Sequence, residues 1–217
     1  MKKIGRLHVL TDAVLQDRFS HLELTELAIS GGADTIQFRQ KEGSTKKLIE
    51  IAQGIRRLCT EKGAVFIVND RIDVAIAAGA NGVHLGQDDF PIPLARKLLG
   101  TDRIIGGSAA TPEEIEICIR EGADYVGFGP VYPTGSKDDA GPVSGINLLK
   151  RIVASTPVPV IAIGGIDQSN TSHVMEAGAH GIAVISNVCC KEDPQKAARD
   201  LYHVIEAASA KRNLPSK

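Results

Sequence analysis

The chain has 217 residues, of which 43% are hydrophobic and 24% are charged. Its 25 basic and 26 acidic side chains leave a formal net charge of −1, which argues against a protein that coats nucleic acid or binds an anionic membrane surface. No apolar run approaches the roughly 20 residues that cross a bilayer, and the basic N-terminus does not have the form of a secretory signal. The four cysteines show no CxxC spacing, so we expect neither structural zinc nor disulfides, and we predict a cytoplasmic protein.

Short apolar runs alternate with segments of helical periodicity along the chain. One helix is expected to begin at Ser44 or Thr45, and another at Thr111, which precedes Pro112 and two acidic residues. Strands that alternate with helices in this way predict a parallel sheet with right-handed crossovers. The expected strands are Leu7–Leu10, Thr35–Phe38, Val65–Val68, Gly82–Leu85, Ile104–Gly106, Tyr125–Phe128, Val158–Ile163 and Gly181–Ile185.

A Gly-Ala-x-x-Ile/Val pattern begins at Gly32, Gly79, Gly122 and Gly178. In each copy the glycine is expected to end a helix, after which the chain enters the second, fourth, sixth or eighth strand of the series. A repeat at every second strand is typical of a closed (βα)8 barrel, so we predict an α/β fold with residues 1–217 as a single TIM-barrel domain. A doubly wound open sheet is the alternative, but it gives no reason for this spacing.

The reactive groups of such barrels lie at the carboxyl ends of the strands. After the second strand, alternation places Gln37, Arg39 and Lys41 on one side, where two cations and an amide suit a multiply charged anion. The alternative is a solvated loop with ordinary surface charges. After the fifth strand, Ser108 offers a small polar group for a ligand.

Two carboxylates follow neighbouring strands. Asn69-Asp70 come directly after the third strand, and Asp89 lies shortly after the fourth. The two carboxylates suit Mg²⁺, with water and phosphate oxygens as its remaining ligands. Helix capping is the alternative for each of them. His84 lies within the fourth strand and is interpreted as a packed, hydrogen-bonded residue.

The segment after the sixth strand, residues 129–142, is long and rich in glycine and proline. Thr134, Ser136 and Lys137 at its centre are the groups that a phosphate-holding lid requires. Gly164-Gly165 and Ser186 follow the seventh and eighth strands, where this architecture repeatedly binds phosphate. No arrangement indicates a protein nucleophile, so the chemistry is expected to be departure of a phosphorylated group with metal assistance.

At these residues the sequence resembles the thiamine phosphate synthase (thiamine-phosphate pyrophosphorylase) family, over essentially the whole chain. The resemblance implies an enzyme, a transferase of thiamine biosynthesis that uses Mg²⁺ as its cofactor. It would join 4-amino-2-methyl-5-hydroxymethylpyrimidine diphosphate to 4-methyl-5-(2-phosphoethyl)thiazole, giving thiamine monophosphate and pyrophosphate by a dissociative, carbocation path. The matching motifs are Gln37–Lys41, Asn69–Asp73, Gly82–Asp89, Ala123–Lys137 and Ala162–Ile166.

The resemblance also implies roles for individual residues. Catalysis would use Lys137, Arg39 and Ser108, and Asp70 and Asp89 would hold Mg²⁺. The partners would be two small phosphorylated substrates, with no nucleic acid and no membrane, and homo-oligomer formation stays open. The pyrimidine diphosphate would contact Gln37, Phe38, Arg39, Gln40, Lys41, Asn69, Ser108 and Lys137. The thiazole phosphate would contact Thr134, Gly135, Ser136, Gly164, Gly165, Ile185 and Ser186.

The chain departs from the family pattern at three places. Ala109-Ala110 follow Ser108 where a histidine is common, Ser136 replaces a threonine, and His8 stands where a tyrosine is common. Two alternatives are a thiazole tautomerase, which uses a histidine in that strand-five loop, and a non-catalytic barrel that binds phosphorylated ligands. The missing histidine argues against the first, and the retained carboxylates and Lys137 argue against the second.

Overall fold

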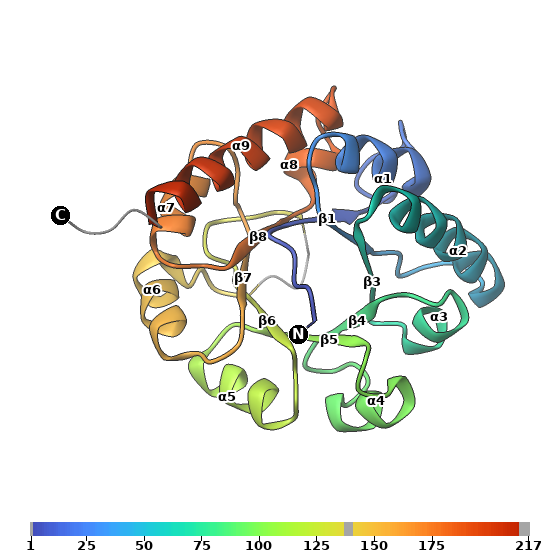
Figure 1. Cartoon of the computed structure of the whole chain (residues 1–217), viewed down its shortest axis with the longest axis horizontal. Helices are drawn as coiled ribbons and strands as arrows, with labels where there is room; N and C mark the ends of the chain where they lie inside the picture. The colour runs from blue at the N-terminus through green and yellow to red at the C-terminus, as the bar shows by residue number, and fades with distance from the viewer. Residues whose placement is uncertain (1, 137–140, 213–217) are drawn as a thin grey trace.

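The computed structural model describes residues 2–136 and 141–212 and places eight parallel strands in a closed barrel (Figure 1). Each strand pairs with the next in sequence, and β8 pairs with β1 through registers such as His8 with Ala183. This closure confirms the predicted TIM barrel and excludes the open sheet. The strands are β1 (Leu7–Thr11), β2 (Thr35–Phe38), β3 (Val65–Asn69), β4 (Gly82–Leu85), β5 (Ile104–Ala109), β6 (Tyr125–Phe128), β7 (Val160–Ile163) and β8 (Gly181–Val184).

Helices form a ring around the barrel (Figure 1). The predicted caps are confirmed, because Ser44 and Thr111 accept hydrogen bonds from the backbone N–H groups of Lys47 and Glu114. Within the described parts of the chain, no helix combines the length and apolarity needed to span a membrane. The helices are α1 (His21–Ser30), α2 (Thr45–Lys62), α3 (Ile72–Ala77), α4 (Ile92–Leu99), α5 (Pro112–Arg120), α6 (Gly145–Ser155), α7 (Thr171–Glu176), α8 (Ser186–Cys189) and α9 (Pro194–Arg212).

Strand limits differ from the predicted ones mainly at β5 and β7. β5 continues to Ala109, because Ser108 and Ala109 still pair with β6. β7 begins at Val160, two residues later than predicted. Pro159 precedes it and has no N–H with which to join the ladder. The extension of β5 matters for the site, since it carries Ser108 on a strand rather than on a loop.

Strand alternation divides the buried side chains into two cores. The larger core fills the space between strands and helices and includes Phe38, Val68 and Phe128. The smaller one fills the barrel interior with Leu10, Val65, Ile67, Ile104, Tyr125, Ile161, Ala183 and Ile185. Side chains that alternate into the interior near the carboxyl ends of the strands are therefore those that face the mouth of the barrel.

The Gly-Ala repeat lies at the opposite, amino-terminal end of the barrel. The four glycines have φ values of 104°, 65°, 94° and 100°, as expected for residues that end helices in a conformation that favours glycine. Three of the repeats continue with a side chain that accepts a hydrogen bond from a backbone N–H of the preceding odd-numbered strand. The pairs are Asp34 with Leu7 (3.1 Å), Asn81 with Phe66 (2.9 Å) and Asp124 with Ile105 (2.8 Å). The repeat thus ties strands together in pairs.

Asp124 makes the folding stability of the barrel depend on pH. Burial raises the pKa of this carboxyl group, but hydrogen bonds from Lys2, Arg96 and the Ile105 N–H outweigh that effect, and the net pKa lies below its ordinary value of 3.8. A carboxyl group whose pKa is lower in the folded state contributes stability above its unfolded pKa and loses it as the pH falls through the folded pKa.

We therefore expect Asp124→Asn to lower the free energy of unfolding at pH 7 by about 2 kcal/mol, because two cations lose a shared anion. The variant should also lose less stability than the parent between pH 5 and pH 2. Urea unfolding at several pH values measures both effects. Parallel stability curves for the two proteins would contradict the assignment.

Candidate active site

A cavity of about 750 Å³ lies at the carboxyl ends of the strands, and side chains from all eight strands or the segments that follow them line it. Most of the predicted site residues meet there, although they are scattered over 150 positions of sequence. Lys137 lies outside the described residues. The predicted residues that line the cavity are Gln37, Arg39, Lys41, Asn69, Asp70, Asp89, Ser108, Thr134, Gly135, Ser136, Gly164, Gly165, Ile185 and Ser186.

Phe38 and Gln40 do not line this cavity. Phe38 is 2% exposed and packs in the outer core, with its ring 4.8 Å from the His21 ring. The Gln40 amide oxygen lies 3.0 Å from His21 Nε2, and its nitrogen donates to the Glu42 carbonyl. Alternation along β2 directs these two side chains away from the side that carries Gln37 and Arg39, so their side chains support the site from outside it.

Asp12 is a functional candidate that the sequence analysis missed. It follows the last residue of β1, is 1% exposed, and forms an ion pair with Arg39 through Nη1 and Oδ2. Its other oxygen accepts hydrogen bonds from the N–H groups of Val14 and Leu15 at 2.8 and 3.1 Å. Asp12 therefore fixes the position of Arg39 at the cavity wall. A sequence signal exists for Asp12, because it lies two residues after the end of a predicted strand, as Asp70 does.

Asp70 has an unusual backbone. Its φ of 63° places a non-glycine residue in the left-handed region, and Arg71 N–H donates to the Asn69 carbonyl at 2.7 Å across it. This three-residue turn is strained, and strain of this kind is found mainly where a site needs a particular side-chain direction. The N-cap residue of α3 is Arg71, so Asp70 does not occupy the capping position.

Asp89 belongs to a tight turn after β4. One of its carboxylate oxygens accepts a hydrogen bond from the Gly86 N–H at 2.6 Å. Pro91, not Asp89, is the N-cap residue of α4. The capping interpretation therefore holds for neither carboxylate, and both side chains line the cavity.

The segment after β6 is attached to the end of β7. The N–H groups of Val131 and Tyr132 donate to the carbonyls of Ile163 and Gly164 at 2.9 and 3.0 Å. Further along, the hydroxyl groups of Ser136 and Ser186 lie 2.8 Å apart. The predicted lid and the predicted phosphate-binding strand ends therefore form one continuous wall of hydroxyl groups and glycines.

All three departures from the family pattern lie on the cavity wall, Ser136 among them. Ala109-Ala110 line it, so an apolar surface stands beside Ser108. His8 lies deep in the barrel, and burial lowers its pKa to about 4, against the opposing effect of Asp34. Its imidazole is therefore neutral near pH 7 and adds no positive charge to the site.

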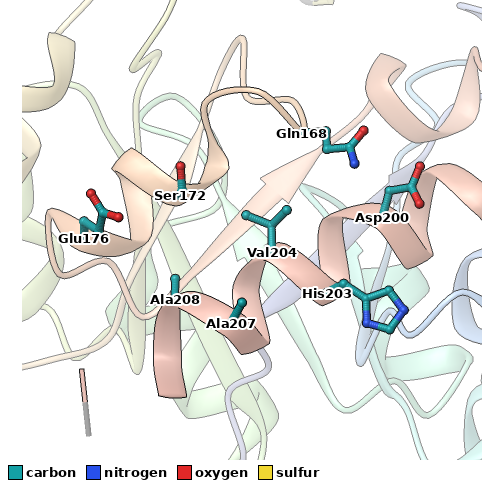
Figure 2. A pocket seen from close by; sticks show the side chains of 8 residues that line it. All are labelled: Gln168, Ser172, Glu176, Asp200, His203, Val204, Ala207 and Ala208. Atoms are coloured by element: carbon teal, nitrogen blue, oxygen red, sulfur yellow. The ribbon is translucent and has the colours of Figure 1, made fainter. Parts of the chain in front are cut away.

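A second hollow of about 300 Å³ lies between α7 and α9, outside the barrel (Figure 2). Glu176 and His203 lie at opposite ends of it, and the polar groups do not point toward a common centre (Figure 2). None of the predicted site residues lines it. The cavity at the barrel mouth is thus the candidate active site.

The chain is similar to known proteins over most of its length. The family described as thiamine monophosphate synthase matches residues 7–188. The chain belongs to this thiamine monophosphate synthase family. It is 50% identical over 196 residues to a thiamine-phosphate synthase of Salinibacter ruber, which covers 90% of this chain and 86% of that protein. It is also 50% identical over 193 residues to one of Methanospirillum hungatei, with 89% and 94% covered.

Solved structures agree with this family membership. A thiamine phosphate pyrophosphorylase from Pyrococcus furiosus superimposes with a TM-score of 0.86 at 41% identity, covering 94% of this chain and 96% of that one. A 3-hexulose-6-phosphate synthase superimposes with a TM-score of 0.67 at 18% identity, which shows the shared fold alone. Membership in the thiamine monophosphate synthase family identifies the chain as a transferase of thiamine biosynthesis, and the resemblance noted in the sequence is confirmed.

Proposed function

We propose that the chain condenses 4-amino-2-methyl-5-hydroxymethylpyrimidine diphosphate with 4-methyl-5-(2-phosphoethyl)thiazole, using Mg²⁺. Thiamine monophosphate and pyrophosphate are the products. The observation that carries this proposal is one cavity in a member of this family, with cations on β2, carboxylates after β3 and β4, and hydroxyl groups and glycines around β6 to β8. Two phosphorylated molecules can thus be held in one space.

The diphosphate binds on the β2 side of the cavity. Arg39 offers a planar set of donors and Lys41 a second positive charge, while the amides of Gln37 and Asn69 supply neutral donors. Lys137 joins this set by its position in the family motif. These groups stabilise the negative charge that grows on the pyrophosphate as its bond to the pyrimidine methyl carbon breaks.

Asp70 and Asp89 fit a magnesium ion. The described residues contain no group of three or more histidine, cysteine or acidic side chains that could hold a metal by themselves. A pair of carboxylates is nevertheless the usual protein share for Mg²⁺, which takes its remaining ligands from water and substrate phosphates. When bound there, the ion would neutralise charge on the diphosphate oxygens.

The thiazole phosphate binds on the opposite side, against Gly164, Gly165 and the hydroxyl group of Ser186. Thr134 and Ser136 contact the rest of this substrate. The carbon–oxygen bond of the pyrimidine diphosphate breaks first, and its electron pair leaves with pyrophosphate. The lone pair of the thiazole nitrogen then forms the new carbon–nitrogen bond, so no protein nucleophile is required.

A substitution at Gly165 tests the proposed binding position of thiazole phosphate. Its φ is 63°, and a Cβ atom there would lie 2.4 Å from the Pro133 carbonyl oxygen. We expect Gly165→Ala to displace the segment before Thr134 and to raise the KM for thiazole phosphate roughly tenfold or more, with a smaller effect on pyrimidine diphosphate.

Gly63→Ala is the matched control for this variant. Gly63 also has a positive φ, of 73°, but nothing lies within 4 Å of its added Cβ, at the end of α2. Both variants should lose about 1 kcal/mol of stability from the backbone strain. Steady-state kinetics and urea unfolding measure the two effects. An unchanged KM for thiazole phosphate in Gly165→Ala would contradict this placement.

The proposed reaction is tested by incubating the purified protein with both substrates and Mg²⁺. We expect equal amounts of thiamine monophosphate and pyrophosphate, and little product after chelation of the metal. In a separate incubation with a thiazole carboxylate phosphate, isomerisation of that compound without condensation would support a tautomerase instead. Ala109-Ala110 on the cavity wall argue against that outcome, because they provide no acid–base group.

A further inference from the structure

Three polar side chains that line the active-site cavity are joined by hydrogen bonds across the barrel interior. Tyr125 Oη lies 2.9 Å from His84 Nδ1, and His84 Nε2 lies 2.9 Å from Ser108 Oγ. The three residues come from β6, β4 and β5, and all three line the cavity. Neither His84 nor Tyr125 has a part in the reaction described above.

Two glycines that face the barrel interior leave room for the rings of Tyr125 and His84. A Cβ atom on Gly106 would lie 2.2 Å from the Tyr125 ring and 2.5 Å from His84 Nδ1. A Cβ atom on Gly127 would lie 3.0 Å from the His84 ring. The interior is thus shaped around the two rings, and packing holds the imidazole with one nitrogen toward Tyr125 and the other toward Ser108.

The donors and acceptors along this hydrogen-bonded series of side chains can be assigned. Tyr125 is 1% exposed, and among the described residues the bond partner of its phenol group is His84 Nδ1. A buried O–H group without an acceptor is costly, so the phenol donates and Nδ1 accepts. The neutral imidazole then carries its proton on Nε2 and donates it to Ser108 Oγ. The hydroxyl hydrogen of Ser108 remains available to the cavity.

We propose that Tyr125 and His84 are positioning residues that orient the Ser108 hydroxyl group as a hydrogen-bond donor into the active site. The site thereby selects a ring that presents an acceptor, such as a pyrimidine nitrogen, at this point. This inference rests on the proposed function and on the contact between Ser108 and the pyrimidine diphosphate that the family resemblance implies. It specifies that Ser108 is the hydrogen-bond donor in that contact, and it attributes this orientation to His84 and Tyr125.

Two substitutions of His84 separate orientation from simple packing. In His84→Gln the side-chain amide nitrogen takes the place of Nε2 and keeps a donor toward Ser108. In His84→Asn it takes the place of Nδ1 and loses that donor. We expect His84→Asn to lower kcat/KM for pyrimidine diphosphate about tenfold below His84→Gln, the effect of one hydrogen bond. The KM for thiazole phosphate should stay within about twofold in both. Equal losses in the two variants would overturn the proposal.

A double-mutant cycle tests whether His84 acts through Ser108. In the Ser108→Ala background, His84→Asn should cause no further loss of kcat/KM, because the group that it orients is already absent. Additive losses would indicate an independent structural effect and would overturn the inference. Thermal unfolding of all variants identifies any that fail to fold, and these are replaced in the cycle by Tyr125→Phe, which removes only the phenol group.

The tautomer of His84 can be measured without any activity. Long-range proton–nitrogen NMR spectra of protein with ¹⁵N-labelled histidine should show the His84 proton on Nε2, with the signal assigned by its loss in His84→Gln. A proton on Nδ1 would overturn the proposed direction. If the parent protein forms no thiamine monophosphate, the proposed function fails. The NMR result still decides whether the hydrogen bonds run from Tyr125 through His84 to Ser108.

Discussion

Replacing Asp89 with alanine is expected to reduce Mg²⁺-dependent formation of thiamine monophosphate by roughly a thousandfold, with the fold retained. The carboxylate lines the cavity and accepts a local hydrogen bond from the Gly86 N–H. Loss of one of two metal-binding carboxylates removes several kcal/mol of transition-state stabilisation, whereas the turn loses one short-range hydrogen bond. Turnover measured over a range of Mg²⁺ concentrations checks this prediction.

Asp88→Asn is the control for Asp89→Ala. It removes a negative charge one residue away, from an exposed side chain on the same cavity. We expect turnover within about fivefold of the parent, because charge loss alone is a small, screened effect at an exposed position. Near-normal Mg²⁺-dependent turnover in Asp89→Ala would remove that residue from the metal site. Equal losses of turnover in both variants would show that turnover depends on the total negative charge of the cavity and not on Asp89 as a metal ligand.

The substitution Arg39→Gln is expected to have two separable effects. Pyrophosphate affinity should fall roughly a hundredfold, because a charged donor is lost from the diphosphate side of the cavity. Stability should fall by about 3 kcal/mol, because the carboxyl group of Asp12, 1% exposed, loses its cationic partner. Isothermal calorimetry with Mg²⁺ and pyrophosphate measures the first effect, and urea unfolding measures the second.

Asp12→Asn distinguishes these two effects. In the double variant with Arg39→Gln, the buried charge is gone, so most of the lost stability should return while pyrophosphate affinity stays low. Asp12→Asn alone should weaken pyrophosphate binding less than Arg39→Gln, since it leaves the guanidinium group in place but less well fixed. If the double variant recovered pyrophosphate affinity, Arg39 would not be a direct ligand.

Much of the architecture could be predicted from local patterns. The glycines that end helices before every second strand indicated a closed barrel, because that spacing reflects how strands are tied in pairs at its amino-terminal end. Alternation along β2 placed Gln37, Arg39 and Lys41 on one side, and all three line the cavity. The same rule directs Phe38 and Gln40 away from it, although the family resemblance had included them.

The sequence by itself therefore determined the barrel and the ring of strand ends that carries the site, because chain direction and alternation are local properties that survive any detail of packing. Only the tertiary structure decided which side chains meet. Asp12 with Arg39, Ser136 with Ser186, and His84 with Tyr125 and Ser108 are contacts across 24 to 50 positions of sequence. Such pairs depend on barrel closure, on register and on glycines that leave room for rings, and these features exist only after the chain has folded.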